Sequence, residues 1–576
     1  YQLALDAVDQ GLATTGVANG NVVCRAKLFP AQYLGRTPVG TAENITRVRG
    51  ADGLPTEILT TPVITQSLID GCQPLNPFGF NQMTKAAKDY VTSPSLFRNV
   101  SKQTFIQASV GGGLFDLPAG PLSININGEY RRDSLAFTTN DLNILGRSRS
   151  APSANTTAFT RTLEGGGEAR IPITGPDFLP FVGELEFNPA FRVTHQSGAA
   201  ATYRNLAGQI ITPSTSGKVG TIFSLAGTWR PIRDIQFRGN FTRSLRQPSI
   251  VELFLGGQPT FQAVTDLCSP ANIDSGNFAT LRRTNCIAAA VANGNATDTP
   301  SANTFLANFV PQGGSLQGTF SGSQQLKPER GRSWTVGAAL TPRFIPGLTL
   351  SADYVNVRLS DTIVVAGVGT FLQACYDSPT YPDPTAQIGI NGCSRFNRGT
   401  DFQLQNGVQA GFLNLGAIEV KAINGSGSYK FELGSNRFLI RASAYYLIKY
   451  DVSPSGDFSD RQKSAGTFGR PQLKTQLSLR YERGDLYSQV TWNRQSPTRI
   501  FSGNDPAGPE VFPFNRYPSL NNIDLAVGAD INQRFRIQVN VANLLDTTAA
   551  GNLGYTFADY YDQIGRRFQV AVTTRF

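Results

Sequence analysis

Histidine and methionine are almost absent from this chain, and charged residues are sparse for its length. The 576 residues include one His, one Met and three Trp, and only 16% are Asp, Glu, Lys or Arg. Uninterrupted apolar runs are missing too, since no stretch approaches the roughly 18 residues that a membrane-spanning helix needs. A lone His also cannot complete a zinc site of the His-and-Cys type.

Glycine and small polar residues are abundant instead. Gly accounts for 58 residues and Pro for 34, and the mean hydropathy of −0.18 would class the chain as soluble. A membrane β-barrel has a similar average, because its strands alternate lipid-facing and lumen-facing residues. Composition therefore leaves two classes open: a membrane β-barrel, and a large secreted β-solenoid or sandwich.

The net charge of +10 does not indicate a nucleic-acid partner. Lys and Arg stand singly in alternating segments, as in Arg534–Phe535–Arg536, and form no basic run. A solvated lumen wall explains this scatter better than a surface that follows phosphates. We therefore expect no binding to nucleic acid.

The six cysteines predict disulfides and an oxidising compartment. Their spacings exclude the C-x-x-C pairs of a zinc site, and six cysteines allow 15 connectivities. Pairing of sequence neighbours gives Cys24–Cys72, Cys268–Cys286 and Cys375–Cys393. All six fall in long segments outside the predicted strands and short turns, as expected of disulfides that cross-link loops.

Alternation with a period of two is the main structural signal. Residues 235–242, 473–482 and 534–545 each alternate apolar side chains with Arg, Gln, Asn or other polar ones. A period of two places one set on each face of a sheet, so the two faces meet different solvents. We predict that one set faces lipid (Phe237, Leu479, Val539, Val541 and Val570) and that the other faces the lumen (Arg238, Arg480 and Asn540).

Fifteen such segments are predicted as strands. They are 104–115, 121–133, 156–172, 181–196, 219–230, 235–246, 330–343, 347–361, 415–432, 437–450, 470–482, 485–496, 521–531, 534–545 and 566–576. Residues 1–103 alternate little, and we interpret them as an extracellular loop region with a disulfide, followed by the barrel at 104–576. The fold class is therefore all-β: a membrane-spanning antiparallel β-barrel.

The connections between these strands alternate in length. Short turns, such as 116–120, 231–234 and 483–484, alternate along the chain with long loops, such as 247–329 and 362–414. Tight periplasmic turns and long external loops are typical of outer-membrane barrels. The last strand has Phe568, Val570, Val572 and Phe576 on one face, which resembles the signal by which the barrel-assembly machinery recognises its substrates for insertion.

Several motifs resemble the TonB-dependent receptor family. TRSLRQPSIVELF at 242–254 and LKPERGRSWTVG at 326–337 resemble the segments that lead into and out of its large loop. DYVNVRLSDTI at 353–363, VANLLD at 541–546 and LFDLPAGPLSININGEYRRD at 114–133 fit neighbouring strands, and GCQPLNPFG at 71–79 fits the preceding loop. The motifs follow the family's order along the whole chain.

The resemblance implies a barrel of about 22 strands with an N-terminal plug domain. Fifteen strands and no plug suggest that the chain begins in an external loop, with about seven strands and the plug upstream. We therefore expect the strand at 566–576 to pair only with 534–545, and the strand near 104–115 to lack its upstream neighbour. Closure of a regular barrel around a plug built from 1–103 would contradict this interpretation.

The implied function is energised uptake across the bacterial outer membrane. The partners would be outer-membrane lipid, TonB and a scarce bulky solute such as a ferric siderophore, cobalamin or an oligosaccharide, with no catalysis, metal or cofactor. A passive porin-like channel and an outer-membrane hydrolase remain as alternatives. The net charge favours an anionic solute.

The sequence does not identify residues that contact the solute. Seven aromatic residues of the long loops either stack on a solute or form the loops' own core, and we favour the core: Phe254, Phe261, Phe305, Phe309, Tyr376, Tyr381 and Phe402. His195 is expected at the rim of an external loop. Asp377 and Asp383 suit Ca²⁺, but the chemistry of turns explains them equally well.

Overall fold

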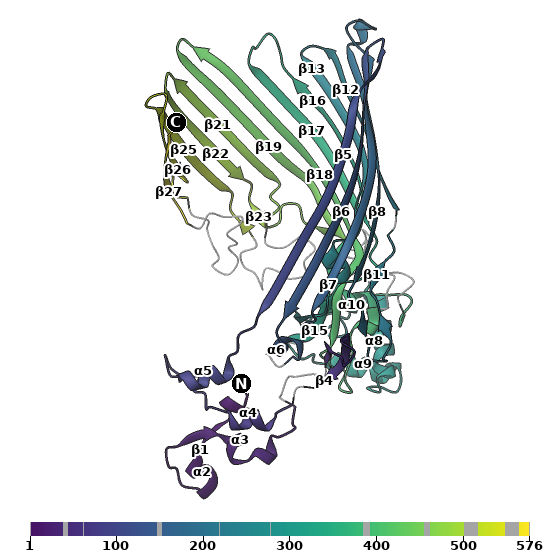
Figure 1. Ribbon diagram of the computed structural model, residues 1–576, viewed down its shortest axis with the longest axis vertical. Coiled ribbons are helices and arrows are strands. Elements are labelled where there is room, and N and C mark those ends of the chain that lie inside the picture. Colours follow the sequence, from purple (N-terminus) through teal and green to yellow (C-terminus); the bar gives the residue numbers. More distant parts are fainter. Residues whose placement is uncertain are drawn as a thin grey trace.

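Fifteen long antiparallel strands form one continuous curved wall (Figure 1). The computed structural model describes residues 2–37, 44–61, 63–146, 152–217, 219–276, 278–383, 392–453, 461–499, 516–547 and 564–574. In spatial order the long strands are β5 (Phe97–Leu117), β6 (Gly120–Thr139), β7 (Thr156–Thr174), β8 (Glu184–Ala200), β12 (Val219–Ile232), β13 (Ile235–Arg246), β16 (Glu329–Leu340), β17 (Leu348–Ala366), β18 (Val408–Leu433), β19 (Asn436–Ser453), β21 (Leu473–Arg483), β22 (Leu486–Gln495), β25 (Leu520–Asp530), β26 (Phe535–Ala542) and β27 (Arg567–Thr574).

Each of the fifteen strands predicted from alternation is present. The bounds of β13 are those predicted, 235–246, whereas β5 begins at Phe97, seven residues before the predicted start. Neighbouring long strands pair antiparallel throughout, for example Phe237 with Trp229 and with Ala338. The fold is therefore the predicted all-β antiparallel wall.

The two ends of the wall differ from the strands between them. In the order of strands around the barrel β27 and β5 are neighbours, yet no backbone register joins them among the described residues, where β5 pairs with β6 and β27 with β26. Nearly every residue of β5 is exposed on both faces, as expected of an edge strand. β5 thus has the exposure of an edge strand, and a free second edge of β27 stays a prediction.

The strands carry a polar face and an apolar face, and we use these names below. On the polar face Arg238 forms an ion pair with Asp353, with its Nε 2.6 Å from the carboxylate. On the apolar face Phe237 and Leu479 are 42% and 45% exposed, which is unfavourable in water but suits lipid. Val541 is the exception within the predicted lipid-facing set, because it is only 9% exposed.

Aromatic side chains gather near both ends of the apolar face. Toward the short turns Trp229 stacks on Phe237, with ring centroids 5.6 Å apart. Toward the long loops Trp334 lies 5.1 Å from Tyr354. Rings with one apolar and one polar side prefer the two membrane interfaces, so these pairs mark the height of the apolar band.

Short turns lie at one end of the wall and long loops at the other (Figure 1). The hairpin of β21 and β22 turns through two residues, of which Gly484 has a φ of +54°. A residue with a side chain rarely adopts that conformation, so glycine permits the two-residue turn here. The short helix η2 (Pro180–Val182) lies in the turn between β7 and β8. The opposite end of the wall contains the other short helices and strands between the long strands: α6 (Asp141–Ile144), β9 (Tyr203–Arg204), β10 (Ile210–Ile211), β11 (Ser214–Thr215), α7 (Ile250–Phe254), β14 (Gln258–Ala263), α8 (Ala279–Ala292), α9 (Thr299–Asn308), β15 (Ser315–Ser321), α10 (Val368–Tyr376), η3 (Gly392–Arg395), β20 (Gln462–Lys463), β23 (Thr498–Arg499) and β24 (Arg516–Tyr517).

The N-terminal residues form small elements of their own below the loop end (Figure 1). These are α1 (Gln2–Leu5), β1 (Ala7–Asp9), α2 (Gln10–Thr15), β2 (Val22–Cys24), α3 (Arg25–Leu28), η1 (Pro30–Gln32), β3 (Asn44–Arg49), β4 (Pro55–Thr60), α4 (Gln66–Asp70) and α5 (Lys85–Val91). The Cys24–Cys72 disulfide lies in a small core with Ala4 and Ile69. The hairpin of β3 and β4 contacts the loop after β8, where Arg47 covers the ring of Tyr203.

Candidate functional site: the loop cap and its anchor

The two sequence segments with the strongest family resemblance meet at the loop end of the wall. Arg246, the last residue of β13, bonds through Nε to Glu329 at the start of β16, at 2.6 Å. The same guanidinium bonds to both oxygens of Glu252 in α7, at 2.9 and 3.0 Å. Glu329 also accepts the backbone N–H of Ile363, at 2.7 Å. One arginine and two carboxylates thus tie the ends of three strands to α7, and we call this cluster the anchor.

The local sequence explains why α7 begins where it does. Ser249 caps the helix by accepting the backbone N–H of Glu252, and the Glu252 carboxylate accepts the N–H of Ser249 in return. This reciprocal capping box satisfies two N–H groups that the first turn would otherwise leave free. The Ser-Ile-Val-Glu order within the motif therefore fixes the start of the helix and aims Glu252 at Arg246.

The apolar residues of α7 pack against the wall. Leu253 and Phe254 are 1% and 3% exposed and lie against Ala158 of β7 and Leu326. Ring atoms of Phe254 lie so close to Gly198 of β8 that a Cβ there would be 3.0 Å away. Burial of two large side chains contributes about 1.5–3 kcal/mol each, so packing and the anchor both hold the base of the large loop.

The pKa of Glu252 makes the anchor sensitive to acid. Burial alone would raise this pKa, but hydrogen bonds from Arg246 and Ser249 outweigh burial and lower it from the ordinary 4.5. A carboxyl with a lowered folded-state pKa stabilises the fold at a pH above its unfolded value, and this contribution is lost as pH falls through the folded value. The anchor is therefore at full strength above about pH 4.5.

We expect Glu252→Gln to loosen α7 at neutral pH and to remove its acid dependence below pH 4.5. Hydrogen exchange of residues 250–255 in the full-length protein, followed from pH 7 to pH 3, measures both effects. Asp298→Asn is a matched control, because it removes another carboxylate that caps a helix of the same loop without touching Arg246. Equal acid sensitivity of the wild type and the Glu252→Gln variant would contradict this role.

Two long loops share one hydrophobic core at the loop end of the wall. We call the described residues of 250–328 and 367–407 the loop cap. Its core is formed by α8, α9, α10 and the segments around them, and its buried members include Ile273, Leu306, Phe309, Phe371, Leu372, Tyr376, Phe396 and Phe402. These amphipathic helices were not predicted. The prediction from sequence relied on alternation with a period of two, which identifies strands but not helices.

Two disulfides cross-link the cap, and each joins cysteines that are neighbours in the sequence, as predicted. Cys268–Cys286 joins the start of the first loop to α8, with a Cα–Cα distance of 5.6 Å. Cys375–Cys393 joins α10 to η3, at 4.9 Å. The Cys24–Cys72 distance of 6.2 Å is also in the usual range of about 4.4–6.8 Å. All six cysteines are therefore paired as predicted.

A buried ion pair joins the two loops of the cap. Arg398 bonds to both oxygens of Asp266 at 2.8 Å, and the two side chains are 6% and 2% exposed. Its guanidinium also donates to the hydroxyl of Tyr376 and lies over the ring of Phe402, 4.1 Å from the centroid. Burial works to lower the pKa of Arg398, but the hydrogen bond to Asp266 outweighs it and raises that pKa. The arginine thus stays charged inside the cap.

The loop aromatics mostly form the core of the cap, as favoured from the sequence. Phe254, Phe309, Tyr376 and Phe402 are at most 5% exposed, and Phe305 and Tyr381 pack against the same core or its edge. Burial raises the pKa of Tyr381 to about 12. Phe261 in β14 is the exception at 51% exposure, which leaves it accessible to a solute.

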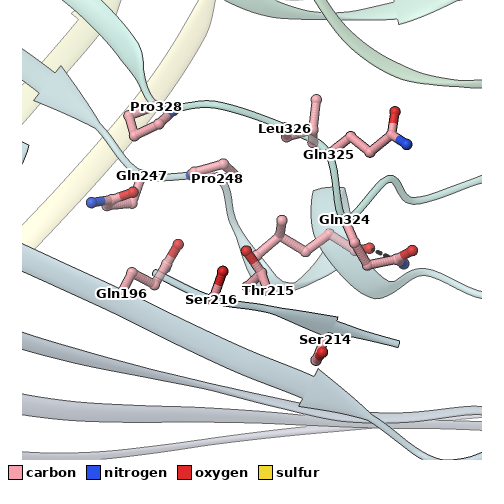
Figure 2. Close-up of a pocket in the computed structure, with 11 residues that line it drawn as sticks. Gln196, Ser214, Thr215, Ser216, Gln247, Pro248, Gln324, Gln325, Leu326 and Pro328 are labelled. Atoms are coloured by element: carbon pink, nitrogen blue, oxygen red, sulfur yellow. Dashed lines mark hydrogen bonds between the residues drawn. The ribbon is translucent and has the colours of Figure 1, made fainter. Parts of the chain in front are cut away.

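A polar pocket of about 210 Å³ lies where the anchor meets β8 and β11 (Figure 2). Gln196, Gln247, Gln324 and Ser216 line it together with Pro248 and Pro328, the prolines of the two motifs. The side-chain nitrogen of Gln247 is buried and has no hydrogen-bond partner among the described residues. Small-molecule sites usually occupy about 300–1,000 Å³, so this pocket alone does not enclose a bulky solute.

The polar face forms a wall of paired charges and amides. Arg192 bonds to Glu164 at 3.0 Å, and Arg536 to Asp530 at 2.7 Å. A shallow hollow of about 390 Å³ lies on this wall beside Tyr445 and Lys474. Many of the scattered basic residues thus belong to the polar face, as predicted. Arg243, Arg332 and Arg358 instead lie on the apolar face, where the register places Glu419 opposite Arg358.

The structure also places two other sequence candidates, His195 on the wall and Asp377 in the loop cap. His195 lies on β8 opposite Val219 and Leu163, on the apolar face rather than beside a Ser or an acid. Asp377 bonds to Arg282 at 2.8 Å, which accounts for its charge. No group of three His, Cys, Asp or Glu residues suited to a metal occurs within the described ranges. Phe576 of the proposed insertion signal lies outside the described residues.

None of the helices in the described part of the chain combines the length and apolar character that a helical membrane crossing requires. The wall of strands has the alternating faces, aromatic pairs and unequal connections of a membrane β-barrel. A family model for the β-barrel of TonB-dependent receptor-like proteins matches residues 65–544. The chain belongs to this TonB-dependent receptor β-barrel family.

The solved structures to which this chain is similar include two receptors and a transporter. The haemophore receptor HasR of Serratia marcescens, solved with its haemophore HasA and haem, is 13% identical, with 84% of this chain and 60% of that chain covered and a TM-score of 0.46. The ferric yersiniabactin uptake receptor FyuA of Yersinia pestis is 12% identical, with coverages of 84% and 56% and a TM-score of 0.44. The ferric citrate transporter FecA is 12% identical, with coverages of 83% and 55% and a TM-score of 0.46.

The chain thus spans about 55–60% of the length of these structures. No curated protein matches the sequence.

Proposed function

We propose that this chain is the barrel wall and loop cap of an outer-membrane receptor for the energised uptake of a scarce, bulky solute. The observation that carries the proposal is the family match over residues 65–544, which includes both anchor segments. Receptors of this family take energy from TonB acting through a plug domain, and we propose the same partners here. Outer-membrane lipid and the barrel-assembly machinery are the other expected partners.

The loop cap supports capture of a solute outside the membrane. Two disulfides, a buried ion pair and a hydrophobic core make it a preformed surface, and preorganisation lowers the entropic cost of binding. The anchor ties the base of this surface to the loop ends of β13 and β16. A solute released from the cap would therefore enter a lumen lined with paired charges and amides.

The net charge of the chain supports an anionic solute less strongly than the sequence suggested. Arginines of the polar face such as Arg192 and Arg238 are already paired with carboxylates, so they offer little free positive charge to an anionic solute. A ferric siderophore, cobalamin and an oligosaccharide all remain suitable. The exposed ring of Phe261 suits stacking on a catecholate or on a sugar face.

Two alternatives make different predictions. A passive porin-like channel would conduct without TonB, and the anchored cap above its lumen is hard to reconcile with free diffusion. An outer-membrane hydrolase would need a relay of His, Ser and an acid. The place of His195 on the apolar face argues against such a relay.

Uptake by cells tests the proposal. The complete gene product is expressed in Gram-negative cells that lack their own receptors, with and without TonB, and supplied with labelled ferric siderophores, cobalamin and oligosaccharides. We expect accumulation of at least one solute class, reduced at least 10-fold without TonB. Glu252→Gln should lower the uptake of that solute, whereas Asp298→Asn should not. Equal uptake with and without TonB would instead support a passive channel.

A further inference from the structure

The polar pocket at the loop end of the wall offers hydrogen-bonding groups but no charge (Figure 2). Its eleven lining residues are four glutamines, three residues with hydroxyl groups, two prolines and two leucines. An ionised group enters such a pocket at a high cost unless a charge of opposite sign meets it there. The lining therefore favours a ligand that is polar but neutral.

The charges next to the pocket also argue against an anionic ligand. Arg246 precedes Gln247 in the chain and is already bound to Glu252 and Glu329. The anchor thus carries one positive and two negative charges. A carboxylate, a phosphate or an anionic ferric complex in the pocket would lie beside net negative charge, which repels it.

Several polar side chains of the pocket are left without hydrogen bonds inside the protein. The buried side-chain nitrogen of Gln247 has no partner among the described residues. Within the same part of the chain, no hydrogen bond is formed by the side chains of Gln196, Thr215 and Ser216. Gln324, by contrast, donates to a backbone carbonyl of α7 at 2.8 Å. Because a buried N–H without a partner destabilises a fold, the pocket gains from a ligand that accepts hydrogen bonds.

Backbone contacts hold these free groups around one space. β11 pairs with β8, and a Cβ on Gly217 would lie 1.7 Å from the carbonyl oxygen of Gln196. Glycine is therefore required for this segment to lie against β8. Figure 2 shows Gln196 and Ser216 projecting toward Gln247 and Pro248 on the other side. The polar groups are thus positioned before a ligand binds.

The shape and size of the pocket suit one sugar ring. Leu253, Leu326 and Pro248 are buried and give the pocket an apolar side. A pyranose has C–H groups on its faces and hydroxyl groups around its rim, and each hydroxyl both donates and accepts, as amides and hydroxyls of the pocket do. The volume of about 210 Å³ equals that of roughly seven water molecules at about 30 Å³ each. This is space for one ring of a larger molecule.

We propose that the polar pocket binds the terminal pyranose unit of a neutral oligosaccharide, with Gln247 donating to it and Gln196 and Ser216 completing the hydrogen bonds. The inference rests on the proposed uptake function and names the class of solute. Gln196 lies on the polar face, because it follows Arg192 and Thr194 at intervals of two and both of these bond to Glu164. The remaining sugar units would therefore extend along the polar face, where amides offer further hydrogen bonds.

Titration of the full-length protein with defined saccharides tests the pocket. The protein is purified in a polyoxyethylene detergent, since maltoside detergents are themselves sugars. Calorimetry measures binding of neutral hexasaccharides of glucose, xylose, mannose and galactose, of a uronic acid hexasaccharide, and of cobalamin. Q247M keeps the length of the side chain and removes its amide, and Q196M/Q247M removes two amides. Q236M is the matched control, because Gln236 lies on the polar face at the turn end of the same strand.

We expect at least one neutral hexasaccharide to bind, and Q247M to weaken that binding about 10-fold, the effect of one lost hydrogen bond between neutral groups. Q196M/Q247M should weaken it further, and Q236M by less than about 2-fold. The uronic acid hexasaccharide should bind at least about 10-fold more weakly than its neutral counterpart. Without sugar, Q247M should be as heat-stable as the wild type or more so, because it removes a buried N–H that has no partner.

Four results would overturn the proposal. These are no binding of any neutral hexasaccharide, equal losses in Q247M and Q236M, tighter binding of the uronic acid or of cobalamin than of every neutral sugar, and lower heat stability of Q247M without sugar. TonB-dependent uptake of a ferric siderophore without any sugar binding would refute the sugar site alone. Sugar binding that depends on Gln247, together with uptake that does not depend on TonB, would refute the proposed function and leave the site.

Discussion

Replacement of Arg398 by leucine is expected to destabilise the loop cap by about 3–5 kcal/mol. The substitution leaves the carboxylate of Asp266, which is 2% exposed, without its partner, and an unpaired buried charge is among the costliest defects in a fold. The cap also loses the bond to Tyr376 and the contact with Phe402. We expect amide exchange in the cap to accelerate on the order of 100- to 1,000-fold.

Hydrogen-exchange mass spectrometry of the full-length protein measures this directly, with the long strands as an internal reference. Arg395→Leu, at the end of η3 and three residues before Arg398, is the matched control, since Arg395 has no ion pair within the described ranges. The double variant D266L/R398L should recover much of the loss, because similar apolar groups can replace a buried pair. Equal effects of Arg395→Leu and Arg398→Leu would contradict the importance of the pair.

Replacement of Val539 by arginine is expected to cost roughly 2–4 kcal/mol of barrel stability. Val539 lies on the apolar face, directly opposite Val527 and Val570. It is four residues above the start of β26 at Phe535, which places it about 10 Å into the apolar band, near the middle of the bilayer. Arginine there must leave water or draw it into the lipid.

Urea unfolding in lipid vesicles measures this cost, with heat-modified mobility as a check of folding. Gln569→Arg on the neighbouring strand is the control, since Gln569 lies opposite Asn540 on the polar face. That substitution should change stability by less than about 0.5 kcal/mol. A larger cost for Gln569→Arg than for Val539→Arg would show that the two faces have been assigned the wrong way round.

The strands of the wall follow from local sequence because each alternates independently of the others. The predicted bounds of β13 are those of the structure, because a short turn precedes the strand and the alternation ends at Arg246. The start of β18 was placed at 415, whereas the strand begins at Val408. Beyond the membrane a strand no longer needs an apolar face, so the alternation that identifies it fades before the hydrogen bonding ends.

The helices of the cap were missed for a related reason. α8, α9 and α10 have 14, 10 and 9 residues, and helices so short are marginal without tertiary support. Their support comes from two disulfides and from Arg398, whose partner Asp266 is 132 residues away in the sequence. No local pattern signals a partner at that distance.

By itself the sequence determined the class of fold, the number of strands in the described wall, the disulfide pairing and the family, because these depend on periodicity, spacing and motif order. Only the tertiary structure decided what lies beside what. Arg246 meets Glu329 across a loop of about 80 residues, and the register alone brings Arg243 opposite Arg332. Register and loop packing arise from contacts between distant segments, so charges that look scattered along the chain meet in the anchor.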